Sequence, residues 1–166
     1  MKFFFTADQH FNHKKIIQMC LRPFGSVEAM NEELIRLHNS VVSPEDTIFC
    51  LGDFGFGSVE DLGNIVSRLN GHLVLVRGNH DGTRTRCLKV GFKDVVNPPF
   101  KHLDGTVLVH DPYAALGLTE TRVLCGHIHN LWKDNGLWHN VGVDVRDFTP
   151  VTMEQITISE AQCPTT

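Results

Sequence analysis

The sequence predicts an α/β protein in which two packed sheets are flanked by helices. Short apolar runs recur along the chain and end at Gly, Asn or Asp, as strands do. In the first half these runs alternate with segments of helical periodicity, whereas the second half holds mostly short runs. With 42% hydrophobic and 20% charged residues, the composition is that of an ordinary globular protein. The pattern favours two packed sheets over one parallel sheet.

Each half of the chain supplies its own elements. In the first half, strands are expected at residues 2–7, 46–51 and 73–76, and helices at 12–20, 26–39 and 58–69. Ser26 and Ser58 are good N-caps for the second and third helices, whose apolar residues follow at core spacing. In the second half, strands are expected at residues 95–96, 106–109, 122–125 and 137–145, with 155–158 closing a sheet edge.

Length, charge and cysteine content restrict the class of protein. A chain of 166 residues can bury one core without disulfides, which predicts a single domain over residues 1–166. The net charge of −4 and the lack of a Lys/Arg-rich run argue against strong binding of duplex nucleic acid. Five widely spaced cysteines without a Cys-x-x-Cys pair predict reduced thiols and a cytoplasmic protein. No window approaches a membrane span, and the apolar start is too short for a signal sequence.

Candidate site residues follow the apolar runs. The run Leu73–Val76 leads into Gly78-Asn79-His80-Asp81, a segment that would otherwise be interpreted as a turn. Four other runs end in the same way, so the polar residues at the five strand ends are Asp8 and His10, Asp53, Asn79 and His80, His110, and His127 and His129. A single histidine after a strand is usually structural, but five such placements together indicate a site. Carboxylate, imidazole and amide oxygen without thiolate suit Mn²⁺, Fe²⁺ or Zn²⁺.

These blocks, in this order, resemble the calcineurin-like metallophosphoesterase family. The blocks are Asp8-x-His10, Gly52-Asp53, Gly78-Asn79-His80-Asp81, His110 and Gly126-His127-Ile128-His129. The resemblance implies a four-layer α/β/β/α sandwich of mixed sheets. The small size and the stretch Asn140–Asp144 look like the compact phage and bacterial members without a cap domain.

The resemblance also implies two divalent metal ions per chain, with Mn²⁺ favoured and Fe²⁺, Ni²⁺ or Zn²⁺ as alternatives. One ion would take Asp8, His10 and His129, and the other Asn79, His110 and His127, while Asp53 would bridge both. In such a site a hydroxide between the metals attacks the phosphorus in line. His80 would be a general acid or a phosphate contact, and Asp81 a turn residue or a partner that orients an imidazole.

The sequence departs from the family's larger protein phosphatases after Gly52-Asp53. Those enzymes continue with an Asp-Arg pair that grips phosphate, whereas here Phe54-Gly55-Phe56-Gly57 follows. Substrate contacts are therefore expected from Asn12, His13 or Arg22, although a helix cap and a surface histidine explain the first two equally well. Weaker candidates are Arg77, Arg84 and Arg86. Trp132 and Trp138 could stack on a base, although tryptophan more often packs in a core.

The predicted function is hydrolysis of a small phosphodiester, such as a cyclic nucleotide, a nucleotide or a nucleic-acid end. Without the Asp-Arg pair the site lacks a clamp suited to the more negative monoester, and without a cap the cleft is open. A phosphomonoesterase acting on a small metabolite or nucleotide is the alternative. A non-catalytic scaffold is disfavoured because every ligand block is present. A metallo-β-lactamase-type hydrolase is disfavoured because its His-x-His-x-Asp-His loop is absent.

Overall fold

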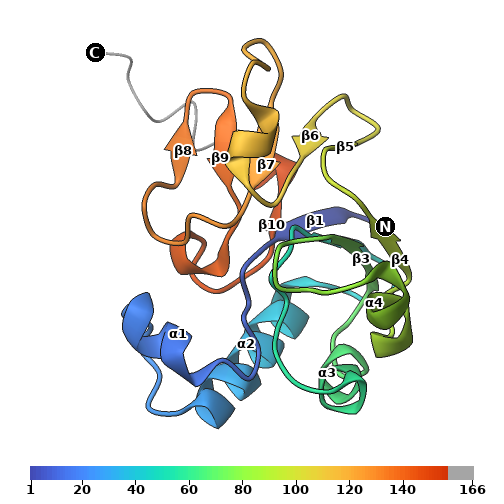
Figure 1. Cartoon of the computed structure of the whole chain (residues 1–166), viewed down its shortest axis with the longest axis vertical. Coiled ribbons are helices and arrows are strands. Elements are labelled where there is room, and N and C mark those ends of the chain that lie inside the picture. The colour runs from blue at the N-terminus through green and yellow to red at the C-terminus, as the bar shows by residue number, and fades with distance from the viewer. Residues whose placement is uncertain (157–166) are drawn as a thin grey trace.

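Two five-stranded mixed sheets pack face to face, and four α-helices cover the outer face of the first sheet (Figure 1). The computed structural model describes residues 1–156. The predicted α/β class, with two packed mixed sheets and helices, is confirmed. No helix in these described residues is long and apolar enough to cross a membrane.

The first sheet has the strand order β10-β1-β2-β3-β4. Its four parallel strands are β1 (Phe3–Thr6), β2 (Thr47–Cys50), β3 (His72–Val76) and β4 (Asp94–Val96). The short strand β10 (Val151–Thr152) runs antiparallel to β1 at the edge. Because β1, β2 and β3 are parallel neighbours, the loops that follow them leave from one edge of the sheet.

The second sheet has the order β5-β6-β7-β9-β8. Its strands are β5 (Phe100–Lys101), β6 (Val107–Leu108), β7 (Val123–Cys125), β8 (Asp134–Asn135) and β9 (Trp138–Asn140). The central strands β6, β7 and β9 are parallel, and the two edge strands are antiparallel. The loops after β6 and β7 therefore also leave from a common edge.

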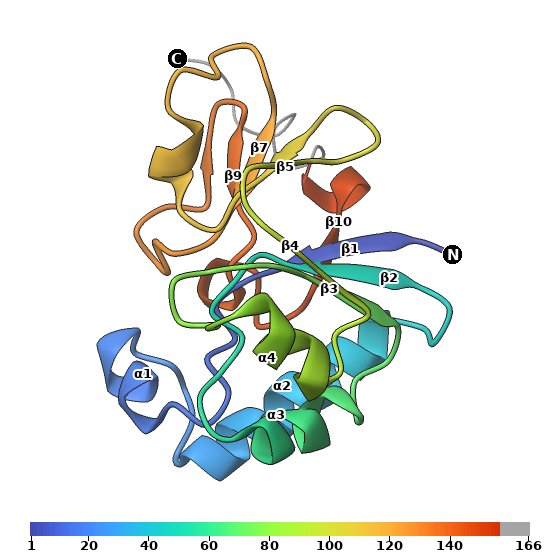
Figure 2. The same ribbon diagram turned by 45° about the vertical axis from the view of Figure 1, so that its right-hand side comes forward.

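The helices α1 (Lys14–Met19), α2 (Val27–Val41), α3 (Val59–Val66) and α4 (Arg84–Val90) lie on the side of the first sheet that faces away from the second (Figure 2). As predicted, Ser26 caps α2 by accepting a hydrogen bond from Ala29, and Ser58 forms a capping box at α3. The outer face of the second sheet is covered by the 3₁₀ turn η1 (Pro112–Ala115) and by loops.

Alternation along the strands divides the core into layers. Phe4 and Ile48 face the helices, whereas their neighbours Phe5 and Phe49 face the second sheet and meet Leu124 there. A smaller cluster lies on the outer face of the second sheet, and Trp132 and Trp138, considered above as base-stacking residues, pack against it. Cys20, Cys50, Cys87 and Cys125 are free thiols, and Cys163 lies outside the described residues.

The structure adds helix α4 to the predicted elements and corrects two predicted strands. Helix α4 was not predicted, because its seven residues bury only Cys87 and Val90. The strand expected at 137–145 ends at Asn140 and is followed by the 3₁₀ turn η2 (Val143–Val145), since the chain crosses there to the first sheet. The edge strand is β10, whereas residues 153–156 are helical; residues 157 and 158 of the predicted strand lie outside the described residues.

Candidate metal centre

The loops after β1 and β2 run side by side and are fixed by backbone hydrogen bonds. Asp8 N donates to Gly52 O over 3.1 Å, and His10 N donates to Asp53 O over 3.1 Å. The second sheet is attached by His110, whose Nδ1 lies 2.8 Å from Leu51 O, and by His127 N, which donates to Asp8 Oδ2 over 2.8 Å. The strand ends of both sheets therefore meet at one place.

Most predicted ligands sit on left-handed backbone. Asp8, His10, Asp53, His127 and His129 have φ values of 57°, 52°, 54°, 72° and 48°. Few residues other than glycine adopt this conformation, and each instance costs on the order of 1–3 kcal/mol. The surrounding sheets hold these five residues in place against that cost, as is common where side chains must converge on a ligand.

Two glycines allow the loops to approach one another. A Cβ on Gly78 would lie 2.5 Å from Asp53 Oδ1, and one on Gly126 would lie 2.6 Å from Asp8 Oδ2. The family blocks Gly78-Asn79 and Gly126-His127 thus need glycine for close contact between segments. We expect an alanine at either position to move a carboxylate that belongs to the candidate site.

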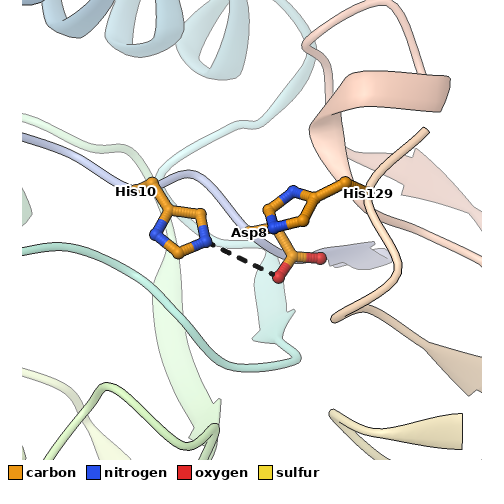
Figure 3. A group of neighbouring side chains, drawn as sticks. All are labelled: Asp8, His10 and His129. Carbon is orange, nitrogen blue, oxygen red and sulfur yellow. Dashed lines mark ion pairs between the residues drawn. The ribbon is translucent and has the colours of Figure 1, made fainter. Parts of the chain in front are cut away.

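The first cluster contains Asp8, His10 and His129, whose candidate ligand atoms all lie within 4.8 Å of one another. Figure 3 shows His10 and His129 approaching the Asp8 carboxylate from separate segments. Asp8 Oδ1 and His10 Nε2 are 4.0 Å apart, and both are buried without a hydrogen-bond partner. Burial lowers the pKa of His10 to about 3, which keeps its imidazole neutral, the form that binds metals. A divalent cation bound between Asp8 Oδ1 and His10 Nε2 would satisfy both of these unpaired atoms.

The second cluster contains Asp53, His110 and His127, again with candidate ligand atoms within 4.8 Å of one another. Asn79 Oδ1 lies 2.9 Å from His110 Nε2, which places the fourth predicted ligand beside the other three. Burial opposes ionisation of Asp53, but its hydrogen bond with His110 and the His110 charge lower the pKa of the carboxyl to about 2. The donor set of imidazole, carboxylate and amide oxygen suits borderline divalent ions.

Asp53 of the second cluster also lies next to the first cluster. Its Oδ2 is 3.7 Å from His10 Nε2 of the first cluster and 3.4 Å from His110 Nε2 of the second. Its Oδ1 accepts a hydrogen bond of 3.0 Å from His80 N, so the loop after β3 fixes the carboxylate. This is the position that a bridging carboxylate would need.

His80 lies next to the Asp53 carboxylate, on the side that faces solvent. Its Nε2 is 3.9 Å from Asp53 Oδ2, and its side chain is 49% exposed. Phe56 packs between His80 and His13, with ring centroids 5.4 and 4.5 Å away. Asn12 is exposed, but its side chain is bonded to Phe56 O and to Asn31. His80 and His13 therefore remain partly exposed beside the candidate ligands, while Asn12 holds the loop that carries Phe56.

Asp81 supports the backbone and orients no imidazole. Its buried carboxylate accepts hydrogen bonds from the backbone N–H groups of Gly78, Asp53 and Phe54 at 2.7, 3.0 and 2.9 Å. These contacts fit the predicted role of Asp81 as a turn residue. They do not fit a partner that orients an imidazole. Asp81 joins the loop after β2 to the loop after β3 and so sets where Asp53 lies.

Arg22 is a support behind the first cluster. Its side chain is fully buried and pairs with Asp144, with Nε 2.7 Å from Oδ1 and Nη2 3.0 Å from Oδ2. Its remaining bonds go mainly to the backbone carbonyls of Asp8 and Gln9. The predicted contact between Arg22 and substrate does not fit this geometry, because the guanidinium is buried and bonded to Asp144 and to backbone carbonyls.

Asp144 connects Arg22 to a candidate ligand. Its Oδ2 lies 2.9 Å from His129 Nδ1, which leaves Nε2 of that ring for the first cluster. A carboxylate in this position fixes the tautomer and the orientation of a metal-binding imidazole. The sequence alone does not predict this role, because Arg22 and Asp144 are 122 residues apart and share no local pattern.

We expect Asp144→Asn to lower metal affinity about 10- to 100-fold, because His129 loses the partner that orients it. It also leaves the buried Arg22 charge without its counter-ion, so stability falls by on the order of 3 kcal/mol. Calorimetric titration of the folded variant with Mn²⁺ measures the affinity, and thermal unfolding measures the stability.

Asp134→Asn is the matched control. Asp134 also joins an arginine to a histidine, through Arg146 Nη2 at 2.6 Å and His139 Nδ1 at 2.8 Å, but His139 is no candidate ligand. The control should lose stability and keep its metal affinity. Wild-type affinity in folded Asp144→Asn would contradict the orienting role.

The other arginines weighed as phosphate clamps are held by the protein itself. Arg77 donates to Gly82 O, Arg84 donates to Val95 O and Asp94, and Arg86 donates to Gly57 O and Asp81 O. None of these contacts joins an arginine to a candidate ligand side chain. These three arginines therefore do not take over the phosphate-binding role of the missing Asp-Arg pair.

Comparisons with known proteins show the family to which this chain belongs. The sequence model of the family described as calcineurin-like phosphoesterase matches residues 1–158. An uncharacterized protein of Methanocaldococcus jannaschii is 32% identical over 93% of this chain and 89% of its own length. The gene 66 protein of Mycobacterium phage L5 is 37% identical over 47% of this chain and 39% of its own length.

Two solved structures share the fold. A protein of unknown function from Aquifex aeolicus has a TM-score of 0.72 and 24% identity, covering 95% of this chain and 98% of its own. A nuclease from Pseudomonas putida has a TM-score of 0.53 and 25% identity, covering 76% of this chain and 61% of its own. With a family match that spans nearly the whole chain and His/Asp clusters at the strand ends, the protein belongs to the calcineurin-like phosphoesterase family, whose members are metal-dependent phosphoesterases.

Proposed function

We propose that the protein is a phosphodiesterase that uses two divalent cations to hydrolyse a small phosphodiester, such as a cyclic nucleotide, a nucleotide or a nucleic-acid end. The observation that carries the proposal is the position of Asp53, whose Oδ2 lies within 3.7 Å of a histidine nitrogen in each cluster. One carboxylate between two ligand sets supports a dinuclear centre over two separate sites. Mn²⁺ is the favoured ion, and Fe²⁺, Ni²⁺ and Zn²⁺ suit the same donors.

Two cations held by these clusters would supply the charge that stabilises the transition state and activates water for in-line attack. The chain's own residues contribute the rest. Asp8, His10 and His129 would hold one cation, and Asn79, His110 and His127 would hold the other, with Asp53 contributing to both. His80 is half exposed beside Asp53, so its imidazole can donate a proton to the leaving oxygen.

Three features support a diester as the substrate. The Asp-Arg pair is missing, and Arg22, Arg77, Arg84 and Arg86 are engaged by the protein, so the site offers little positive side-chain charge for a doubly charged monoester. His80 and His13 are partly exposed, which leaves room for a substituent. The Pseudomonas putida protein of related fold is a nuclease, and nucleases cleave phosphodiesters.

Side-by-side assays of bis(4-nitrophenyl) phosphate and 4-nitrophenyl phosphate test this proposal. With Mn²⁺ restored to metal-stripped protein, we expect kcat/KM for the diester to exceed that for the monoester by at least about tenfold. Metal-stripped protein without Mn²⁺ is the control and should hydrolyse neither. A clear preference for the monoester would replace this proposal with a phosphomonoesterase.

A further inference from the structure

A pocket of about 380 Å³ opens beside the candidate metal centre, and two of the residues that line it are candidate metal ligands. His127 and His129 line it together with Ile128 and Leu131 of the same loop, with Met19 at the end of α1 and with Tyr113 of η1. Pockets of this size accommodate small organic groups. Because the imidazoles are shared, a group bound in the pocket lies next to whatever the metal centre holds.

The chain positions this pocket with the same segments that position the ligands. Tyr113 follows His110 by three residues, and Asp111 fixes the intervening turn by accepting a hydrogen bond of 2.9 Å from Tyr113 N. The loop after β7 turns through a hydrogen bond from Leu131 N to Ile128 O. Asn140 Nδ2 donates to His129 O over 2.7 Å and holds that loop against β9. The pocket wall and the metal centre are thus built as one unit.

The side chains at the pocket are unusually apolar for surface residues. Met19, Tyr113 and Leu131 are 69%, 71% and 77% exposed. Large apolar side chains grouped around a cleft usually mark a binding site. None of the described residues that line the pocket is Lys, Arg, Asp or Glu, and Asn130 supplies an amide. The pocket therefore suits an uncharged group with an apolar face and a hydrogen-bonding edge.

We propose that this pocket binds the base of a nucleoside ester, so that the substrate is a phosphodiester carrying one nucleoside. The inference rests on the function proposed above. A base is flat, uncharged and edged with donors and acceptors, which matches Tyr113 as a stacking face and Asn130 as an amide partner. The residues around His80, namely His13 and Phe56, do not line this pocket. The nucleoside is therefore the retained substituent, and the group that leaves lies at the His80 side.

Two substrates with the same leaving group test the pocket. Thymidine 5′-(4-nitrophenyl) phosphate carries a base on its retained side, whereas methyl 4-nitrophenyl phosphate does not. We expect wild type to prefer the thymidine ester by at least about tenfold in kcat/KM, as one base–aromatic stack allows. Tyr113→Ala should lose about tenfold on the thymidine ester and stay within about twofold on the methyl ester.

Three further variants separate stacking from general effects. Tyr113→Phe keeps the ring and should keep the preference, and Leu131→Ser should lower it. Leu103→Ser is the matched control, because Leu103 is 91% exposed and lies outside the pocket. Equal rates of wild type on the two esters, or equal losses on both in Tyr113→Ala, would overturn the inference.

A binding experiment distinguishes failure of the pocket from failure of the proposed function. If wild type hydrolyses neither diester, the proposed function is wrong. Calorimetry on the Mn²⁺-loaded protein then decides the pocket without turnover. We expect thymidine 5′-phosphate to bind at least about tenfold more tightly than inorganic phosphate, and Tyr113→Ala to abolish the difference. Equal affinities in wild type would mean that no base is recognised.

Discussion

Replacing Asp53 by asparagine is expected to lower kcat/KM for a phosphodiester by more than about a hundredfold, since even residues that only support a metal ligand cost 10- to 100-fold. Asp53 Oδ2 lies beside His10 of one cluster and His110 of the other. Asparagine keeps an oxygen for the hydrogen bond from His80 N, but it removes the charge and the second carboxylate oxygen. The measurement is steady-state hydrolysis of bis(4-nitrophenyl) phosphate at saturating Mn²⁺.

Asp53→Ala and Asp81→Asn serve as comparisons. Asp53→Ala also loses the bond to His80 N, so it should be less stable than Asp53→Asn while equally inactive. Asp81→Asn weakens the backbone contacts that place Asp53 but removes no ligand, so it should be destabilised and keep more activity than either. Activity of Asp53→Asn within about tenfold of wild type would show that the two clusters do not share this carboxylate.

His80→Ala is expected to keep its bound metal and to lose activity in a way that depends on the leaving group. His80 is not needed to complete either cluster, and its half-exposed ring lies 3.9 Å from Asp53 Oδ2. General acid catalysis contributes about 10²- to 10⁴-fold when the leaving oxygen needs a proton. The loss should therefore be largest for alkyl esters and much smaller for nitrophenyl esters, whose leaving group departs as the anion.

His72→Ala is the control for that experiment. His72 is exposed at the first residue of β3, whereas the candidate ligands follow the last residues of the strands. It should match wild type on every ester. A plot of log kcat/KM against leaving-group pKa, measured for wild type and His80→Ala, gives the answer. Parallel lines would mean that His80 contacts the phosphate and donates no proton.

The strand ends could be predicted from sequence because each candidate ligand directly follows an apolar run. Phe3–Thr6 leads to Asp8, and Val123–Cys125 leads to His127, so the order along the chain already places these residues at sheet edges. Parallel pairing then brings the ends together. The two clusters at these strand ends, Asp8 with His10 and His129 and Asp53 with His110 and His127, consist of residues that this pattern predicts.

The supporting residues could not be predicted in the same way, because their partners are distant in the chain. The sequence predicts Arg22 as a phosphate contact, since an arginine near a ligand loop carries no local sign of burial. Its role depends on Asp144, which lies 122 residues further along the chain. The apolar pocket likewise joins Met19, Tyr113 and Leu131 from three segments. Periodicity detects faces of single elements and not such assemblies.

The central claim is that two ions are bound and that Asp53 is common to both. Elemental analysis after Mn²⁺ reconstitution and removal of excess metal tests it most directly, with wild type and Asp53→Asn prepared in parallel and circular dichroism used to confirm that both are folded. We expect two Mn²⁺ per chain in wild type and at most one in folded Asp53→Asn. Wild type that saturates at one ion, or a variant that retains two, would contradict a dinuclear centre bridged by Asp53.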